Sequence, residues 1–236
     1  MGDHVDGVLV PRAMRIPALA LLIVSAVVLS VLSWHYHDVA TYRWFYALHR
    51  QWGPDGYHVT GTTSTVIAWF GSTVGVAVIA SLSALVSLLR RRPRAALLFL
   101  IGPALAAVAS ERVLKPLVHR TLNDFLAFPS GHATGAFACA LAMVFAVQPL
   151  PAPGLRVESW RVVTAVGALL AAVTVALTVV YRGSHHLSDS IGGAAVAGVV
   201  VPAVAFLVDA LFAGRAARGR GLSSSVERVL VGGHRR

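Results

Sequence analysis

Apolar residues are grouped in long runs along this chain, and short polar segments separate the runs. A helix of about 20 apolar residues is long enough to cross the hydrocarbon layer of a membrane. In lipid a helix is favoured because it satisfies its own backbone hydrogen bonds. The pattern therefore predicts an all-α, polytopic membrane protein with six transmembrane helices. The six runs cover residues 16–34, 59–89, 95–114, 132–147, 162–181 and 187–212.

The segment after the first run has a different character. Residues 35–58 mix tryptophan and tyrosine with histidine and arginine, which is common where a protein meets the membrane–water interface. The mixture predicts a short interfacial helix near residues 39–51, ended by Gly53-Pro54. In the second run, Gly71 and Gly75 are four residues apart, a spacing that lets two helices approach closely.

The composition agrees with a membrane location. Of the 236 residues, 56% are hydrophobic and 13% are charged, whereas about 25% of an average soluble domain is charged. A formal net charge of +10 would suit nucleic acid. The basic residues lie at the ends of apolar runs, however, so no nucleic-acid partner is expected. The single cysteine, Cys139, lies inside an apolar run and is expected to be a buried core residue.

The positions of the basic residues predict an orientation in the cell membrane. Fourteen arginines lie in the N-terminal segment, the connections at 90–94 and 156–161 and the tail, and six basic residues lie on the opposite side. The positive-inside rule then makes both termini cytoplasmic and the connections after the third and fifth helices extracytoplasmic. The chain divides into a cytoplasmic N-terminus (1–15), a membrane domain (16–212) and a basic cytoplasmic tail (213–236), which we expect to be loosely ordered.

A polar motif, Pro129-Ser130-Gly131-His132, stands at the start of the fourth run. Pro129 cannot continue a preceding helix, and Ser130 is a good N-cap for the next one. The start of a helix presents unpaired N–H groups and a positive dipole, which suit an anion. Gly131 leaves that backbone open to a ligand, and His132 can exchange a proton near neutral pH. A plain helix cap would explain the same residues.

A second group of polar residues precedes the sixth run. His185 and Asp189 are four residues apart, so the first turn of a helix would place them on one face. A carboxylate beside an imidazole orients the ring and leaves its other nitrogen free for nucleophilic attack. His132 would then protonate the leaving oxygen. The neighbouring His186 would point away from His185 and is expected to be interfacial.

Basic residues near both motifs predict a phosphate clamp. Lys115, Arg120 and Arg182, with the backbone at Ser130 and Gly131, can hold a phosphate and its developing charge. A nucleophile, an acid and an anion clamp together predict phosphoryl transfer through a phosphohistidine. The histidines would also suit zinc or iron. The positive charge around them disfavours a cation, so we expect no metal and no cofactor.

These motifs, in this order, resemble the type 2 phosphatidic acid phosphatase superfamily, which is related to the vanadium haloperoxidases. The family pattern has three blocks: Lys, six residues and Arg-Pro; Pro-Ser-Gly-His; and Ser-Arg, five residues, His, three residues and Asp. The chain has Lys115 of the first block, the complete second block, and His185 and Asp189 of the third. It has Leu122-Asn123 in place of Arg-Pro, and Thr178-Val179 in place of Ser-Arg.

The resemblance extends over residues 35–210 and implies a membrane hydrolase. We expect a phosphatase for a lipid phosphate or a polyprenyl (di)phosphate, with its site at the extracytoplasmic face. A homo-oligomer is compatible with the sequence. Two other functions stay open. The absent arginines would fit a catalytically weak or inactive member that binds an anionic lipid or a partner protein. A transporter is disfavoured because no run has an ionisable residue near its middle.

Overall fold

The computed structural model of the chain describes residues 8–35, 61–122, 125–147 and 159–232. The interfacial helix expected near residues 39–51 lies outside these ranges. The described elements, in chain order, are α1 (Arg12–His35), α3 (Thr62–Trp69), α4 (Thr73–Leu89), α5 (Pro93–Val108), the π-helix η1 (Ala109–Leu114), α6 (Lys115–Val118), the strands β1 (Thr121–Leu122) and β2 (Phe125–Leu126), α7 (Gly131–Ala146), α8 (Ser159–Tyr181) and α9 (Leu187–Gly232).

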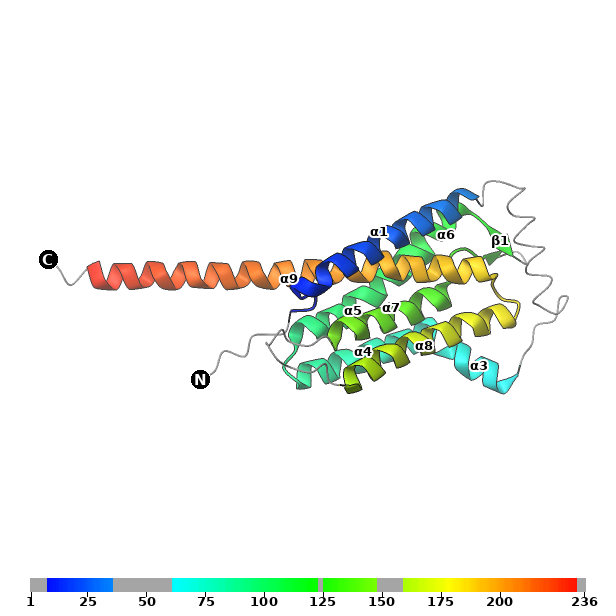
Figure 1. The fold of residues 1–236 in the computed structure, drawn as a ribbon, viewed down its shortest axis with the longest axis horizontal. Coiled ribbons are helices and arrows are strands. Elements are labelled where there is room, and N and C mark those ends of the chain that lie inside the picture. The colour runs from blue at the N-terminus through cyan, green and yellow to red at the C-terminus, as the bar shows by residue number, and fades with distance from the viewer. Residues whose placement is uncertain (1–7, 36–60, 123–124, 148–158, 233–236) are drawn as a thin grey trace.

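The long helices lie side by side in one bundle with α7 in its interior (Figure 1). α7 packs against α5, α8 and α9, while α1 packs on α9 and α4 packs on α5. Every predicted apolar run contains a helix. Four helical segments of the described residues are long and apolar enough to cross a membrane: α1, the stretch from α5 to α6, α8 and the first part of α9. The bent pair of α3 and α4 would make a fifth span. α7 has only 16 residues, so the number six stays a prediction.

Small side chains fill the interior of the bundle, and large apolar side chains cover its exterior. Alanines such as Ala138 and Ala142 on α7 are fully buried, and small residues let neighbouring helices approach closely. On the outside, Ile16 is 79% exposed and Leu89 is 75% exposed. An exterior of this kind is expected where helices contact lipid rather than water.

A bend of 51° separates α3 from α4 within the second apolar run. Ser72 caps α4, and its side chain accepts a hydrogen bond from the backbone N–H of Gly75 at 3.2 Å. A side chain at Gly71 would lie 2.7 Å from the carbonyl oxygen of His132. The predicted close approach of helices is therefore found at Gly71, where the bend meets α7. Gly75 packs instead against the carbonyl group of Trp69 within the bend.

The C-terminal tail is helical, and the expectation of a loosely ordered segment was wrong for residues 213–232. α9 continues past the membrane-spanning part to Gly232 and extends well beyond the other helices (Figure 1). Starting a helix is the costly step, whereas adding residues to an existing helix is not. The apolar run before the tail provides that start, and the tail contains no proline to end the helix.

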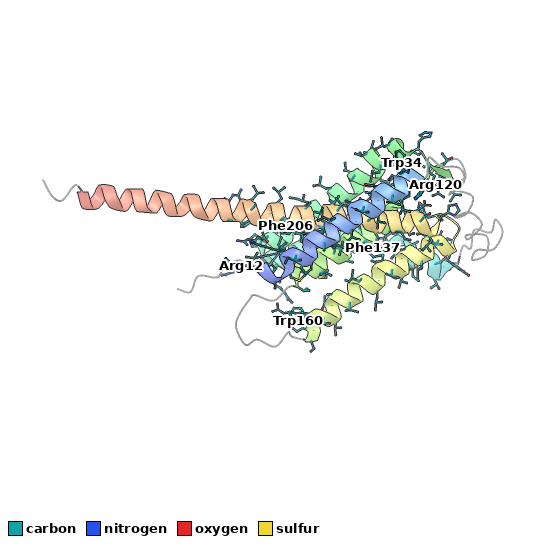
Figure 2. All side chains as sticks on the ribbon, turned by 45° about the horizontal axis from the view of Figure 1, so that its top comes forward. Arg12, Trp34, Arg120, Phe137, Trp160 and Phe206 are labelled. Carbon is teal, nitrogen blue, oxygen red and sulfur yellow. The ribbon has the colours of Figure 1, made fainter. Side chains whose placement is uncertain are left out.

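The two ends of the bundle carry different residues. At one end, which we call the site end, α7 and α9 begin, and the chain passes from α5 through η1 and α6 into the β1–β2 hairpin. Figure 2 shows Arg120 and Trp34 at the site end and Arg12 at the opposite end. The hairpin is antiparallel and pairs Thr121 with Leu126. It is a small addition to a mostly helical fold.

Candidate active site

Ser130 caps the start of α7, as the sequence predicts, whereas its own N–H is bonded to the carbonyl oxygen of Asp189 and is not free for the predicted phosphate clamp. Ser130 is the N-cap in extended conformation, and its side chain accepts a hydrogen bond from the N–H of Ala133 at 3.4 Å. Thr134 Oγ1 donates a hydrogen bond to the Ser130 carbonyl oxygen at 2.8 Å. The N–H groups of Gly131 and His132 belong to the first turn, so they have no partner within the helix. They form a small region of positive potential beside the His132 ring.

The turn before α9 differs from the expected arrangement. α8 ends at Tyr181 and α9 begins at Leu187, so His185 lies in the turn and not on the first turn of a helix. Asp189 lies inside the helix, and its Oδ2 accepts a hydrogen bond from the N–H of His186 at 2.7 Å. This carboxylate therefore helps to cap α9. Nδ1 of His185 lies 3.7 Å from the same oxygen, an ion-pair distance longer than a hydrogen bond.

His186 is buried, with 4% of its surface exposed, and the expectation that it would be interfacial was wrong. That expectation assumed a helix, in which neighbouring side chains point in different directions. The turn between α8 and α9 instead packs both His185 and His186 into the protein. His132 and His185 come together, with their ring centroids 6.5 Å apart.

Backbone contacts hold α7 and α9 in register at this point. The N–H of Ser130 donates a hydrogen bond to the carbonyl oxygen of Asp189 at 2.9 Å. A side chain at Gly193 would lie 2.6 Å from the carbonyl oxygen of Ser130. Only a glycine at position 193 allows the two helices to come this close. The relative positions of His132 and His185 therefore depend on direct contact between the helices that carry them.

Each of the three basic residues predicted for the clamp has a partner within the protein. Arg120 forms an ion pair with Asp189 through Nη1 and Oδ1, and the side chain of Asp189 is fully buried. Nη1 of Arg182 donates a hydrogen bond to Oγ1 of Thr65, on α3, at 2.9 Å. Nζ of Lys115 lies 2.7 Å from Oε2 of Glu111. Lys115 and Arg182 also place positive charge near His132, and Glu111 places negative charge there.

A cavity of about 670 Å³ connects these residues with the apolar part of the bundle. Lys115, Gly131, His132 and His185 line one region of it, and Arg120 and Arg182 are not among its described lining residues. The remainder lies between α4 and α5 and is mainly apolar. Its lining there includes Val76, Ala77, Ala80, Leu100, Pro103, Ala104 and Ala107. The cavity therefore combines a charged region at the site end with an apolar region between two helices.

Comparisons with known proteins agree with this arrangement. A family model described as the PAP2 superfamily matches residues 19–212. The chain belongs to this superfamily. Its fold is similar to the crystal structure of a transmembrane PAP2-type phosphatidylglycerolphosphate phosphatase from Bacillus subtilis, with a TM-score of 0.60 and 21% sequence identity over 84% of this chain and 96% of that chain. A search of curated proteins gave no match.

Within this PAP2 fold, the two departures from the motif pattern lie in different environments. Leu122 is half-buried in β1, and Arg120 lies two residues before it, at the base of the hairpin. Val179 is 2% exposed in α8, and Arg182 lies just past the end of that helix. The structure thus places Arg120 and Arg182 near the substituted positions, but with Asp189 and Thr65 as their partners. Their role toward phosphate stays a prediction.

Glu111 is a residue of the site that the sequence motifs did not predict. It lies in η1, lines the cavity and pairs with Lys115. The four-residue spacing between Glu111 and Lys115 is a recognisable signal for an acid–base pair on a helix. Among the described residues, no group of three His, Cys, Asp or Glu side chains is arranged to hold a metal ion.

Proposed function

We propose that this chain is a membrane phosphatase that removes phosphate from a lipid phosphate or a polyprenyl (di)phosphate. The cavity that contains His132 and His185 is the observation that carries the proposal. Its charged region suits a phosphate, and its apolar region between α4 and α5 suits a hydrocarbon chain. Membership of the PAP2 superfamily and the fold shared with a transmembrane phosphatase support the same assignment.

In the proposed reaction, His185 attacks phosphorus. A nitrogen–phosphorus bond forms while the bond between phosphorus and the lipid oxygen breaks. His132 gives its proton to that oxygen, and the lipid alcohol leaves, or the lipid monophosphate if the substrate is a diphosphate. His132, now neutral, takes a proton from water, which attacks the phosphohistidine and releases inorganic phosphate. Both imidazoles line the same cavity with their ring centroids 6.5 Å apart, and this proximity supports these roles.

The residues that hold the phosphate divide into two groups. Lys115 and the N–H groups at Gly131 and His132 line the cavity and can contact the phosphate directly. Arg120 is paired with Asp189 and acts through it, because Asp189 in turn lies beside His185. Arg182 reaches the phosphate only after it leaves Thr65. No residue of this set requires a bound metal ion for its part in the reaction.

The charge distribution supports a site at the extracytoplasmic face. Three arginines (90–92) connect α4 with α5, and Arg94 lies in the first turn of α5. This is the end of the bundle where α1 starts with Arg12. α9 leaves the bundle at this same end (Figure 1). The positive-inside rule assigns the arginine-rich end to the cytoplasm, and the site end then faces outward.

A second candidate function is binding without turnover. This chain lacks arginine at two positions of the family motif, which favours this function. The two nearby arginines, Arg120 and Arg182, are already paired within the protein. A Leu122→Arg variant separates the two functions. Turnover that appears only in the variant would favour a binding protein, whereas turnover in the parent protein favours a phosphatase.

The test is phosphate release by the purified protein in detergent or vesicles. The substrates are a panel of lipid phosphates and polyprenyl mono- and diphosphates, each with and without a chelator. We expect release from at least one of these substrates, no effect of the chelator, and a loss of at least a thousandfold in His132→Ala and His185→Ala. The absence of release from every substrate would contradict the proposal.

A further inference from the structure

Glu111 lies where the candidate site would hold an anion. It belongs to η1, a six-residue π-helix between α5 and α6, and π-helical turns are frequent at functional sites. Its Oε2 lies 2.7 Å from Nζ of Lys115. The side chain of Glu111 is 44% exposed and that of Lys115 is 15% exposed. Both residues line the cavity, so the pair forms part of its wall.

The other carboxylate oxygen of Glu111 lies against the start of α7. A methyl group added at Gly131 would overlap Oε1 of Glu111, and it would lie 4.0 Å from Nζ of Lys115. The carboxylate thus lies between the Lys115 ammonium group and the first turn of α7. We call this position the anion site. It has a positive charge on one side and the positive end of a helix dipole on the other.

We propose that Glu111 occupies the anion site in the unliganded protein and that a phosphate group must displace it to bind. Glu111 is then an internal competitor that sets the affinity of the site for phosphate. The proposal rests on the proposed function for the identity of the anion. Displacement is sterically feasible because the partly exposed Glu111 side chain can turn toward the open part of the cavity.

The other charged groups near the anion site do not share this role. Lys115, His132 and Arg182 are basic, and Asp189 is held by Arg120 and by the N–H of His186. Glu111 is therefore the carboxylate, among the described lining residues, that a phosphate would meet. Neutralising it removes both the competitor and a repulsive charge. Phosphate affinity is then expected to rise by about tenfold.

The experiment measures binding of inorganic phosphate to the full-length protein in detergent, by phosphorus NMR titration at constant ionic strength. Glu111→Gln keeps the size of the side chain and removes its charge, and Glu111→Ala removes the whole carboxylate. Both are expected to lower the phosphate Kd about tenfold. Glu111→Asp keeps the charge and is expected to bind more weakly than either. Glu227→Gln, in the part of α9 beyond the bundle, is the control with the same change in net charge and is expected to match the parent.

Two results would overturn the inference. An unchanged Kd in both neutral variants would show that Glu111 does not compete with phosphate. A higher Kd would show that Glu111 orients Lys115 for binding. Because the measurement needs no turnover, it is independent of the phosphatase assay. A protein that hydrolyses no lipid phosphate but binds phosphate more tightly after Glu111→Gln would contradict the proposed function alone.

Discussion

Asp189 is the residue on which the candidate site depends most. Its side chain is fully buried, and it contacts the Arg120 guanidinium, the N–H of His186 and, at 3.7 Å, the His185 ring. A buried carboxylate is costly unless it is paired and hydrogen-bonded. Asp189 therefore holds the turn that carries His185 and links Arg120 with that histidine.

Replacement of Arg120 by glutamine should damage both stability and catalysis. The change leaves a buried carboxylate without its cationic partner, and the loss of one member of a buried pair costs about 3–5 kcal/mol. We expect a lower unfolding temperature in detergent and a kcat at least tenfold lower than that of the parent. Arg182→Gln is the matched control, since Arg182 pairs with an exposed threonine. An Arg120 variant as stable as Arg182→Gln would contradict the role assigned to Arg120.

At the level of single residues, spacing along the sequence predicted the members of the site better than their partners. Lys115, His132 and His185 line one cavity, as expected from motifs at the ends of apolar runs. The pair of Arg120 with Asp189 joins residues 69 positions apart, and no local pattern indicates it. The position of His185 before α9 depends on which residue begins the helix, a boundary that sequence patterns determine poorly.

The contact between α7 and α9 is the element-level feature that sets the geometry of the site. His132 comes from α7, and His185 immediately precedes α9. Gly193 lets the backbones of these helices approach, because any side chain there would meet Ser130 and Thr134. The preceding residue, Gly192, is in close contact with another part of the chain, since an added methyl group there would overlap the Phe128 ring.

Gly193→Ala should separate the two helices and impair the proposed phosphatase activity. Overpacking a tight contact costs about 1–3 kcal/mol, and the shift also moves His185 away from His132. We expect a lower unfolding temperature and a fall in kcat of at least tenfold. Gly167→Ala, on α8, is the control, because a methyl group there meets no atom within 4 Å. Equal behaviour of the two variants would show that the close approach is not needed.

The hydrophobic runs predicted where the helices lie, whereas the bends and contacts of these helices depend on tertiary packing. Each of the predicted runs contains a helix, and Ser130 caps α7 as expected. The bend between α3 and α4 was not predicted, since no proline marks it. It arises where Gly71 packs against the carbonyl group of His132. Such a contact depends on a segment distant in sequence and leaves no periodic signal.

On the scale of the whole molecule, the end opposite the site end is closed by the N-terminal segment. The backbone N–H groups of Leu9 and Val10 donate hydrogen bonds to the two oxygens of Asp209, at 3.1 and 2.9 Å. Nη1 of Arg94 lies 3.3 Å from the same carboxylate. Leu9 and Val10 are almost fully buried. Asp209 thus connects the N-terminal segment and α5 to its own helix, α9.

Asp209→Asn should lower stability without changing the chemistry. The amide is a weaker acceptor and offers one oxygen in place of two, so we expect a loss of about 1–3 kcal/mol. Thermal unfolding in detergent measures the loss. The KM of the folded protein should not change, because Asp209 is at the end of the bundle remote from His132. A changed KM with unchanged stability would contradict the structural role.

The predicted orientation can be tested by labelling introduced cysteines in sealed cells. His119 is exposed at the site end and Arg91 is exposed at the opposite end. In a Cys139→Ser background, a membrane-impermeant maleimide should label His119→Cys and leave Arg91→Cys unlabelled until the cells are opened. The reverse labelling pattern would place the site in the cytoplasm and contradict the positive-inside assignment.

The most direct test of the account is detection of the covalent intermediate. The purified protein is mixed with a lipid phosphate that it hydrolyses, quenched at alkaline pH during turnover, and digested for mass spectrometry. We predict phosphate on His185 in the parent protein, and neither this modification nor turnover in His185→Ala. Turnover that proceeds in His185→Ala at the parent rate, or phosphate carried by another residue, would contradict the mechanism.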